Sequence, residues 1–243
     1  MLFMFGMFDE LYAFKKSLMK RKIIPYNSEP IVLGESKDKS VWFYFINSAQ
    51  IKYGILRKNL FLENRRIEYY IADISMLFKE DANETKILLE DLFRGACNNI
   101  ESKIREGYKI NLLGISLGNI FTIRAASIYP CQKLISISGG SRLGRSSWDG
   151  LLTRELASKS GLSQEDYEKT LSNFDPYQYV KDVKSEEILV YLGGKDKLIR
   201  SEYGIELLKS FQKYHSNIKA KFYPYADHCS SIYLALKDQA RFS

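Results

Sequence analysis

Short apolar runs alternate with amphipathic helical segments from about residue 30 to the end of the chain. Residues 41–46, VWFYFI, are apolar throughout, which is typical of a strand buried on both faces of a sheet. Residues 85–106 instead carry apolar side chains at helical spacing, and Gly107 follows as a helix stop. Strands and helices in alternation predict an α/β fold with a mostly parallel central sheet flanked by helices. The same patterns predict strands over 67–72, 110–115, 134–138, 188–192 and 218–223, and helices over 119–129, 202–214 and 230–237.

Residues 142–182 interrupt this alternation. They are polar and helix-forming, rich in Ser, Glu, Lys and Gln, and they contain no strand-like run. We therefore expect one domain over residues 30–243, with a small helical insertion at about 142–182 between two strand–helix units.

The first 29 residues form a separate amphipathic segment. Residues 1–8 are apolar, Asp9 and Glu10 follow at once, and several basic residues come after them. A secretion signal fits poorly, because no basic residue precedes the apolar run and no small-residue cleavage site follows it. We expect residues 1–29 to form a helix packed on the body or on a second subunit. Contact with a membrane surface is the alternative interpretation, and the sequence leaves the oligomeric state open.

Composition excludes several function classes. Hydrophobic residues make up 45% of the 243 residues, which is ample for a core and too much for a disordered chain. The net charge of +7 is spread along the chain without an aromatic–basic binding motif, so nucleic acid is not an expected partner. The chain has only two histidines, and its three cysteines lie outside any C-x-x-C motif, so we expect no metal site. The odd number of cysteines without a paired spacing predicts a reducing, cytoplasmic compartment.

The motif that carries chemistry is G-x-S-x-G at residues 114–118, where a predicted buried strand passes into a helix. At such a junction this motif is the nucleophile elbow. The turn is so tight that the backbone of Ser116 is strained, and side chains at Gly114 and Gly118 would collide with the neighbouring strand or helix. An ordinary glycine-containing strand–helix turn is the alternative interpretation.

A nucleophilic serine requires a base, and the chain offers only His215 and His228. His228 lies after the last predicted strand and just before the last helix. A loop at this point opens at the carboxyl edge of the sheet, the edge that also holds Ser116 and where open α/β sheets place their sites. His215 lies at the end of a helix, where it most simply caps or solvates the helix terminus. We therefore predict that His228 is the base.

The base in turn needs an orienting acid, for which Asp196 is the best candidate. It follows the predicted strand 188–192 through Gly-Gly-Lys and so lies at the same edge of the sheet. A turn aspartate without a catalytic role is the alternative. Asp175 and Asp182, in or beside the insertion, are weaker candidates, and Asp227 is adjacent to the histidine and points the opposite way in an extended segment.

These features together resemble the α/β-hydrolase superfamily from about residue 30 onward. The turn around Ser116, the strand-G-G-K-D segment that ends at Asp196, and the strand-loop-His that ends at His228 occur in the order of that family's triad. Its members are mostly esterases, lipases, thioesterases, peptidases and related acyl-transfer enzymes. The resemblance implies that residues 142–182 form a cap over the site and that no metal or organic cofactor is required.

The sequence departs from the family after the third strand, where members commonly carry His-Gly ahead of an oxyanion-hole amide. Residues 47–50 here read Asn-Ser-Ala-Gln. The resemblance implies that the N–H of Leu117 is the first donor of the oxyanion hole, and that Ala49 or Ser48 supplies the second. A backbone amide donates whatever its side chain is, so the missing glycine affects the shape of the hole.

The first functional hypothesis is a serine hydrolase that cleaves a small-molecule carboxylic ester or thioester through an acyl-enzyme intermediate. A peptidase of small peptides, or an acyltransferase, would use the same triad. A catalytically inactive binding protein on this fold is the third reading. Apolar residues in the insertion predict either an apolar acyl pocket or simple packing on the body; they are Trp148, Leu151, Leu152, Phe174, Tyr177 and Tyr179.

Overall fold

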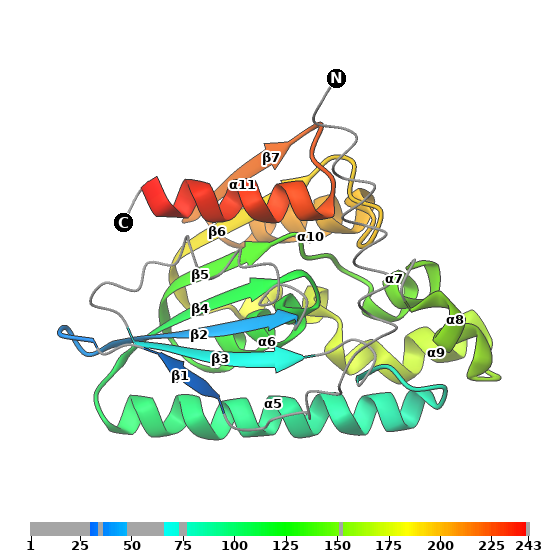
Figure 1. Ribbon diagram of the computed structural model, residues 1–243, viewed down its shortest axis with the longest axis horizontal. Coiled ribbons are helices and arrows are strands. Elements are labelled where there is room, and N and C mark those ends of the chain that lie inside the picture. The colour runs from blue at the N-terminus through cyan, green and yellow to red at the C-terminus, as the bar shows by residue number, and fades with distance from the viewer. Residues whose placement is uncertain (1–29, 34–35, 48–65, 73–76, 151–152, 242–243) are drawn as a thin grey trace.

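The structure is a computed structural model, and it describes residues 30–33, 36–47, 66–72, 77–150 and 153–241. The predictions for residues 1–29 lie outside this part of the chain. The described residues form a seven-stranded sheet in the order β1-β3-β2-β4-β5-β6-β7 (Figure 1). Strands β2 to β7 are parallel, and only β1 runs antiparallel to its neighbour β3. The strands are β1 (Ile31–Leu33), β2 (Ser40–Asn47), β3 (Arg66–Ala72), β4 (Lys109–Ile115), β5 (Cys131–Ile137), β6 (Ser185–Gly193) and β7 (Ile218–Tyr223).

Helices cover both faces of the sheet, as the sequence predicts. One face carries the larger apolar core, to which α5 (Ala82–Arg105), α6 (Asn119–Ile128) and α10 (Ser201–Tyr214) contribute. The other face packs against α11 (His228–Arg241). Among the described residues, no helix combines the length and the apolar character needed to cross a membrane.

The central strands are buried on both faces because their side chains alternate between the two cores. In β2, Phe43 and Phe45 belong to the larger core, whereas Trp42 and Tyr44 belong to the α11 side. The ring of Phe45 stacks on Phe121 of α6 with centroids 5.8 Å apart, which joins the helix to the sheet. The apolar run at 41–46 is therefore the doubly buried strand that the sequence predicts.

Several elements differ from the sequence-based expectation; β6 and α5, for example, each begin three residues earlier than expected. Strand β1 was not predicted, because three residues are too few to show an alternating pattern. Strand β5 begins at Cys131, earlier than expected, since its first residues include the polar Gln132 and Lys133. Helix α11 begins at His228, and the carboxylate of Asp227 accepts the backbone N–H of Ser230 (2.9 Å) at this helix start.

The stretch between β5 and β6 is helical and packs on the sheet. It holds α7 (Leu143–Asp149), α8 (Arg154–Lys159) and α9 (Gln164–Leu171), followed by the 3-10 turns η2 (Ser172–Phe174), η3 (Pro176–Gln178) and η4 (Val180–Asp182). Figure 1 shows α7, α8 and α9 at the side toward which the arrows of β2 and β3 point. Tyr167 and Phe174 are fully buried and are part of the core of the sheet. The insertion is thus packed on the body along much of its length.

The packing at Gly118 makes a testable prediction about stability. A Cβ atom added there would lie 2.0 Å from the carbonyl oxygen of Phe45, and both groups belong to rigid backbone. We expect Gly118→Ala to lower the free energy of unfolding by about 3 kcal/mol, because the helix or the strand must shift. Urea unfolding measures this change.

Gly161→Ala is the matched control, because Gly161 has a positive φ of 70° and open space around it. It should cost only about 1 kcal/mol, from the backbone conformation alone. Equal losses in the two variants would show that the contact with Phe45 does not limit residue 118.

Candidate active site

Ser116 occupies a strained turn between β4 and α6. It begins the 3-10 turn η1 (Ser116–Gly118), and its φ of 57° lies in the left-handed region that non-glycine residues rarely adopt. A Cβ atom on Gly114 would lie 2.5 Å from the Thr122 hydroxyl oxygen, and Gly118 contacts the backbone of Phe45. Steric crowding therefore requires glycine on both sides of Ser116.

Asp196 and His228 are joined directly by a hydrogen bond. The His228 Nδ1–H donates to Asp196 Oδ2 over 2.7 Å, since an ionised carboxylate can only accept. The other oxygen, Oδ1, accepts the backbone N–H groups of Leu198 (3.0 Å) and Ile199 (3.1 Å), which fixes the carboxylate. This arrangement leaves Nε2 as the ring nitrogen that can accept a proton.

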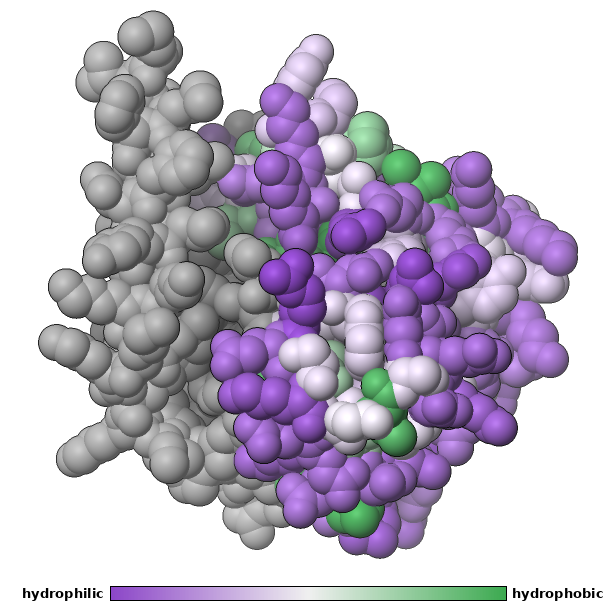
Figure 2. All heavy atoms as spheres, turned by 90° about the vertical axis from the view of Figure 1, so that its right-hand side faces the viewer, coloured by the Kyte–Doolittle hydropathy of each residue, from purple (hydrophilic) through white to green (hydrophobic). Residues whose placement is uncertain are grey.

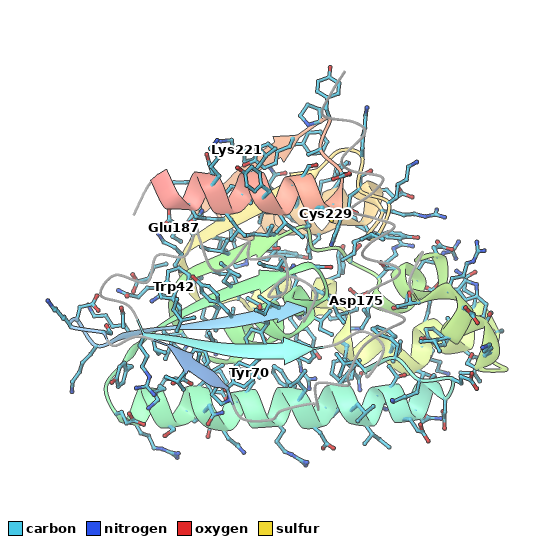
Figure 3. All side chains as sticks on the ribbon, viewed as in Figure 1. Trp42, Tyr70, Asp175, Glu187, Lys221 and Cys229 are labelled. Carbon is cyan, nitrogen blue, oxygen red and sulfur yellow. The ribbon has the colours of Figure 1, made fainter. Side chains whose placement is uncertain are left out.

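Ser116, Asp196 and His228 follow β4, β6 and β7, and parallel strands bring their carboxyl ends to one edge of the sheet. All three are buried, with exposed fractions of 8%, 6% and 7%. Figure 3 labels Cys229, the neighbour of His228, on the side to which the strand arrows point, and Glu187 on the other side. Among the described residues, the Ser116 hydroxyl makes no hydrogen bond with His228. The structure thus pairs Asp196 with His228 and places Ser116 at the same edge of the sheet.

His215 lies at the opposite edge of the sheet, because it follows α10 and precedes β7. Its Nε2 lies 2.6 Å from the carbonyl oxygen of Val180, and its ring packs near Phe211. This contact joins the end of α10 to the turn η4, so His215 has a structural role at the helix terminus.

The three alternative candidates for the acid, Asp175, Asp182 and Asp227, also lie in structural positions. Asp175 accepts the backbone N–H groups of Arg142 and Tyr177, each at 3.0 Å, and caps the turn η3. Burial raises the pKa of its carboxyl above the usual value. Asp182 ends the turn η4 just before β6, on the amino side of the sheet, and Asp227 caps α11.

The residues expected to form the oxyanion hole are only partly described. Leu117 follows Ser116 in the turn η1 and is buried. Ser48 and Ala49 lie outside the described residues. Strand β2, which they follow, pairs with β4 in the register Phe45↔Gly114, so its last residue Asn47 is at the same edge as the Ser116 turn.

The apolar residues of the insertion pack on the body. Phe174 is fully buried in the core, Trp148 and Tyr179 pack against that core, and Tyr177 is exposed. The guanidinium of Arg124 on α6 lies over the rings of Phe174 (5.2 Å) and Tyr179 (5.5 Å). For these residues the structure favours packing over an acyl pocket, and Leu151 and Leu152 lie outside the described residues.

The surface on this side is largely polar. Figure 2 faces the side of the molecule that holds α7, α8 and α9, and its described part is mostly hydrophilic, with hydrophobic residues scattered singly. The Tyr203 hydroxyl donates to Asp149 (2.9 Å), and burial together with this carboxylate raises the pKa of Tyr203. Arg142 is paired with Glu206 at 2.9 Å. No group of three or more His, Cys, Asp or Glu side chains suited to a metal ion occurs in the described part of the chain.

Sequence reasoning missed three buried polar residues around the site: Asn119, Ser138 and Ser231. The amide of Asn119 donates to the carbonyl oxygens of Ser116 (2.9 Å) and Ile137 (3.0 Å). The hydroxyl oxygens of Ser138 and Ser231 lie 2.6 Å apart across 93 residues of sequence. A contact of this range leaves no periodic signal, and only the placement of Ser138 as the last residue of a predicted strand marks it.

No protein-family model matches the chain, and no curated protein matches it. Solved structures match at low sequence identity. The chain is similar to the acylaminoacyl peptidase of Pyrococcus horikoshii, with 15% identity, a TM-score of 0.61 and coverage of 87% of this chain but only 37% of the peptidase. It is similar to Est1E from Butyrivibrio proteoclasticus, with 12% identity, a TM-score of 0.59 and coverage of 88% and 100%.

A third similar structure is the Pyrococcus furiosus esterase Pf2001, with 12% identity, a TM-score of 0.56 and coverage of 88% of this chain and 87% of the esterase. Each of these proteins shares the parallel sheet flanked by helices. At such identities the likeness concerns the arrangement of the backbone. The chain therefore has the α/β-hydrolase fold.

Proposed function

We propose that this protein is a serine hydrolase that cleaves a small-molecule carboxylic ester or thioester through an acyl-enzyme intermediate. The observation that carries the proposal is the buried hydrogen bond from His228 Nδ1 to Asp196, at the sheet edge where the strained turn holds Ser116. An imidazole held by a carboxylate on one nitrogen is a base on the other, and a serine at the same edge is its natural partner.

In the proposed reaction, Ser116 Oγ attacks the carbonyl carbon while His228 Nε2 takes the hydroxyl proton. Asp196 stabilises the resulting imidazolium. The N–H of Leu117 and an amide after β2, from Ser48 or Ala49, hold the oxyanion. The imidazolium then protonates the alcohol or thiol as it leaves. Water, deprotonated by His228, attacks the acyl-enzyme and releases the acid and the free serine.

The extent of the structural likenesses favours an ester over a peptide. The chain spans 87% of the esterase Pf2001 but only 37% of the acylaminoacyl peptidase. The likeness to the peptidase favours a second candidate, cleavage of small peptides or acyl transfer by the same triad. In either case we propose that the insertion between β5 and β6 acts as a cap over the site. None of the three cysteines forms a disulfide bond, which supports the proposal of a reducing, cytoplasmic compartment.

Replacement of the nucleophile tests the proposal. Ser116→Ala should lower kcat/KM for p-nitrophenyl acetate, butyrate and octanoate by about a thousandfold or more, because no oxygen remains to form the acyl-enzyme. A fluorophosphonate should add its mass to Ser116 in the wild type and not in the variant. Peptide amides measured beside the esters separate the two candidate substrates. If the wild-type protein is folded by circular dichroism but is neither labelled nor active, the serine hydrolase proposal is wrong. That result would favour the inactive binding protein.

The acid is tested by Asp196→Asn, with Asp227→Asn as its matched control. The amide of an asparagine at 196 cannot hold His228 with its proton on Nδ1 in the same way, so kcat should fall by about a thousandfold or more. Asp227 is the neighbour of His228 but caps α11 through Oδ1, an acceptor that asparagine keeps. Its variant should retain activity within about threefold. Equal losses in the two variants would remove Asp196 from the mechanism.

A further inference from the structure

Strand β5 lies between the strand that carries the proposed nucleophile and the strands that carry its acid and base. The order β4-β5-β6-β7 places Ser116 on one side of β5, and Asp196 and His228 on the other. Because Ser116 and His228 share no hydrogen bond in the described structure, their relative position depends on what holds each of them to β5.

On the nucleophile side, the amide of Asn119 holds the Ser116 turn to the end of β5. Its Nδ2 donates both to the Ser116 carbonyl and to the carbonyl of Ile137, the last residue of β5. Asn119 is 1% exposed, and a Cβ atom on Gly139 would lie 2.6 Å from its Cγ. The Asn119 side chain is therefore fixed between the carboxyl ends of β4 and β5.

On the base side, the hydroxyls of Ser138 and Ser231 connect the end of β5 to His228. Ser231 Oγ donates to the carbonyl of His228 (2.9 Å), so its single proton is in use, and the Ser138 hydroxyl must donate to Ser231 Oγ (2.6 Å). The two serines are 2% and 0% exposed, so water does not replace this bond.

The backbone of Ser138 is held in an unusual conformation that forms this bridge. Its φ is 48°, in the left-handed region, and its N–H donates to the carbonyl of Tyr191 in β6 (2.8 Å). Ser116, at the end of the adjacent strand, is also left-handed. Strained backbone persists only where the surroundings fix it, and such positions cluster at functional sites.

We propose that the carboxyl end of β5 positions the nucleophile and the base relative to each other, through Asn119 on the Ser116 side and through the Ser138–Ser231 hydrogen bond on the His228 side. The inference rests on the proposed serine hydrolase function. Asn119, Ser138 and Ser231 are positioning residues that take no part in the bond changes. Asn119 bonds to the backbone of Ser116, Ser231 bonds to the backbone of His228, and Ser138 acts through Ser231.

Ser138→Gly is the most informative variant, because glycine accepts the positive φ at residue 138 without strain. The fold and its thermal stability should be retained while the hydroxyl is lost. We expect kcat for p-nitrophenyl butyrate, and the rate of fluorophosphonate labelling, to fall about tenfold with KM within twofold. Ser231→Ala should show at least the same loss, because it removes this bond and also the bond to the His228 carbonyl. The double variant should be no slower than Ser231→Ala alone, because the Ser138–Ser231 bond is already lost there.

Ser127→Ala is the matched control. Ser127 is also buried and also donates to the carbonyl three residues earlier, at Arg124 (2.7 Å), but it lies near the end of α6 distant from Ser116. The activity of the Ser127→Ala variant should stay within twofold of that of the wild type. Losses in Ser138→Gly and Ser231→Ala that multiply in the double variant would overturn the shared bridge.

A second readout does not require activity. The chain has only two histidines, so protein labelled with ¹⁵N-histidine gives two ring spin systems in NMR spectra, which a His215→Gln variant assigns. The His228 Nδ1 proton on Asp196 should be visible in the wild type and broadened by faster exchange in Ser138→Gly, whereas the His215 signals should not change.

The two readouts separate the possible failures. A wild type without labelling or turnover rejects the proposed function, and the NMR comparison then still tests whether β5 holds the histidine. A wild type that is labelled, with Ser138→Gly equally fast and its His228 signal unchanged, overturns the inference while the proposed function stands.

Discussion

The close approach of helix α6 to strands β2 and β4 determines the arrangement at the carboxyl edge of the sheet. Stacking of Phe121 on Phe45 draws the helix onto the sheet, and Gly118 then contacts the Phe45 carbonyl with no room for a side chain. The chain must leave β4 and enter α6 within a single tight turn, and Ser116 takes the left-handed conformation that this turn requires. The position of the serine is therefore a consequence of core packing some residues away from it.

Close packing at a glycine also determines the position of His228, the proposed base. A Cβ atom on Gly193, at the end of β6, would lie 2.7 Å from the carbonyl oxygen of Ala226, so the loop before His228 can lie directly on that strand. Backbone hydrogen bonds from Gly194 to Tyr223 and from Lys195 to Ala226, both 2.9 Å long, join the two loops. The Asp196–His228 pair is thus built on loops that are already bonded to each other through their backbones.

The sequence predicts the sheet well because the central strands are buried on both faces. The continuous apolar run 41–46 and the mainly apolar run 110–115 have no other simple explanation between helical segments. Strand β1 is too short for such a pattern, and the polar, half-buried Gln132 and Lys133 near the start of β5 interrupt its apolar run.

The residues of the candidate site could likewise be predicted only where a short stretch of sequence shows the constraint on them. Ser116 could be found because its constraint is local and leaves glycines at fixed spacing. Asp196 and His228 could be placed because each follows a predicted strand. Asn119, Ser138 and Ser231 could not, because their hydrogen bonds join residues far apart in the chain and any polar side chain at these positions looks alike in the sequence.

The packing of the insertion restricts how the proposed cap could move. Opening the segment from α9 to η2 as a rigid lid would expose Tyr167, Leu171 and Phe174, all fully buried. Each such side chain contributes roughly 1.5–3 kcal/mol on burial, so the sum is a large part of the stability of a typical domain. Helix α7 is packed on buried neighbours as well. Leu143 belongs to the core of the sheet, Gly144 lies directly against Glu168 of α9, and the ring centroids of Trp148 and Tyr167 are 5.7 Å apart. Movement of either α7 or α9 as a lid would therefore separate buried side chains.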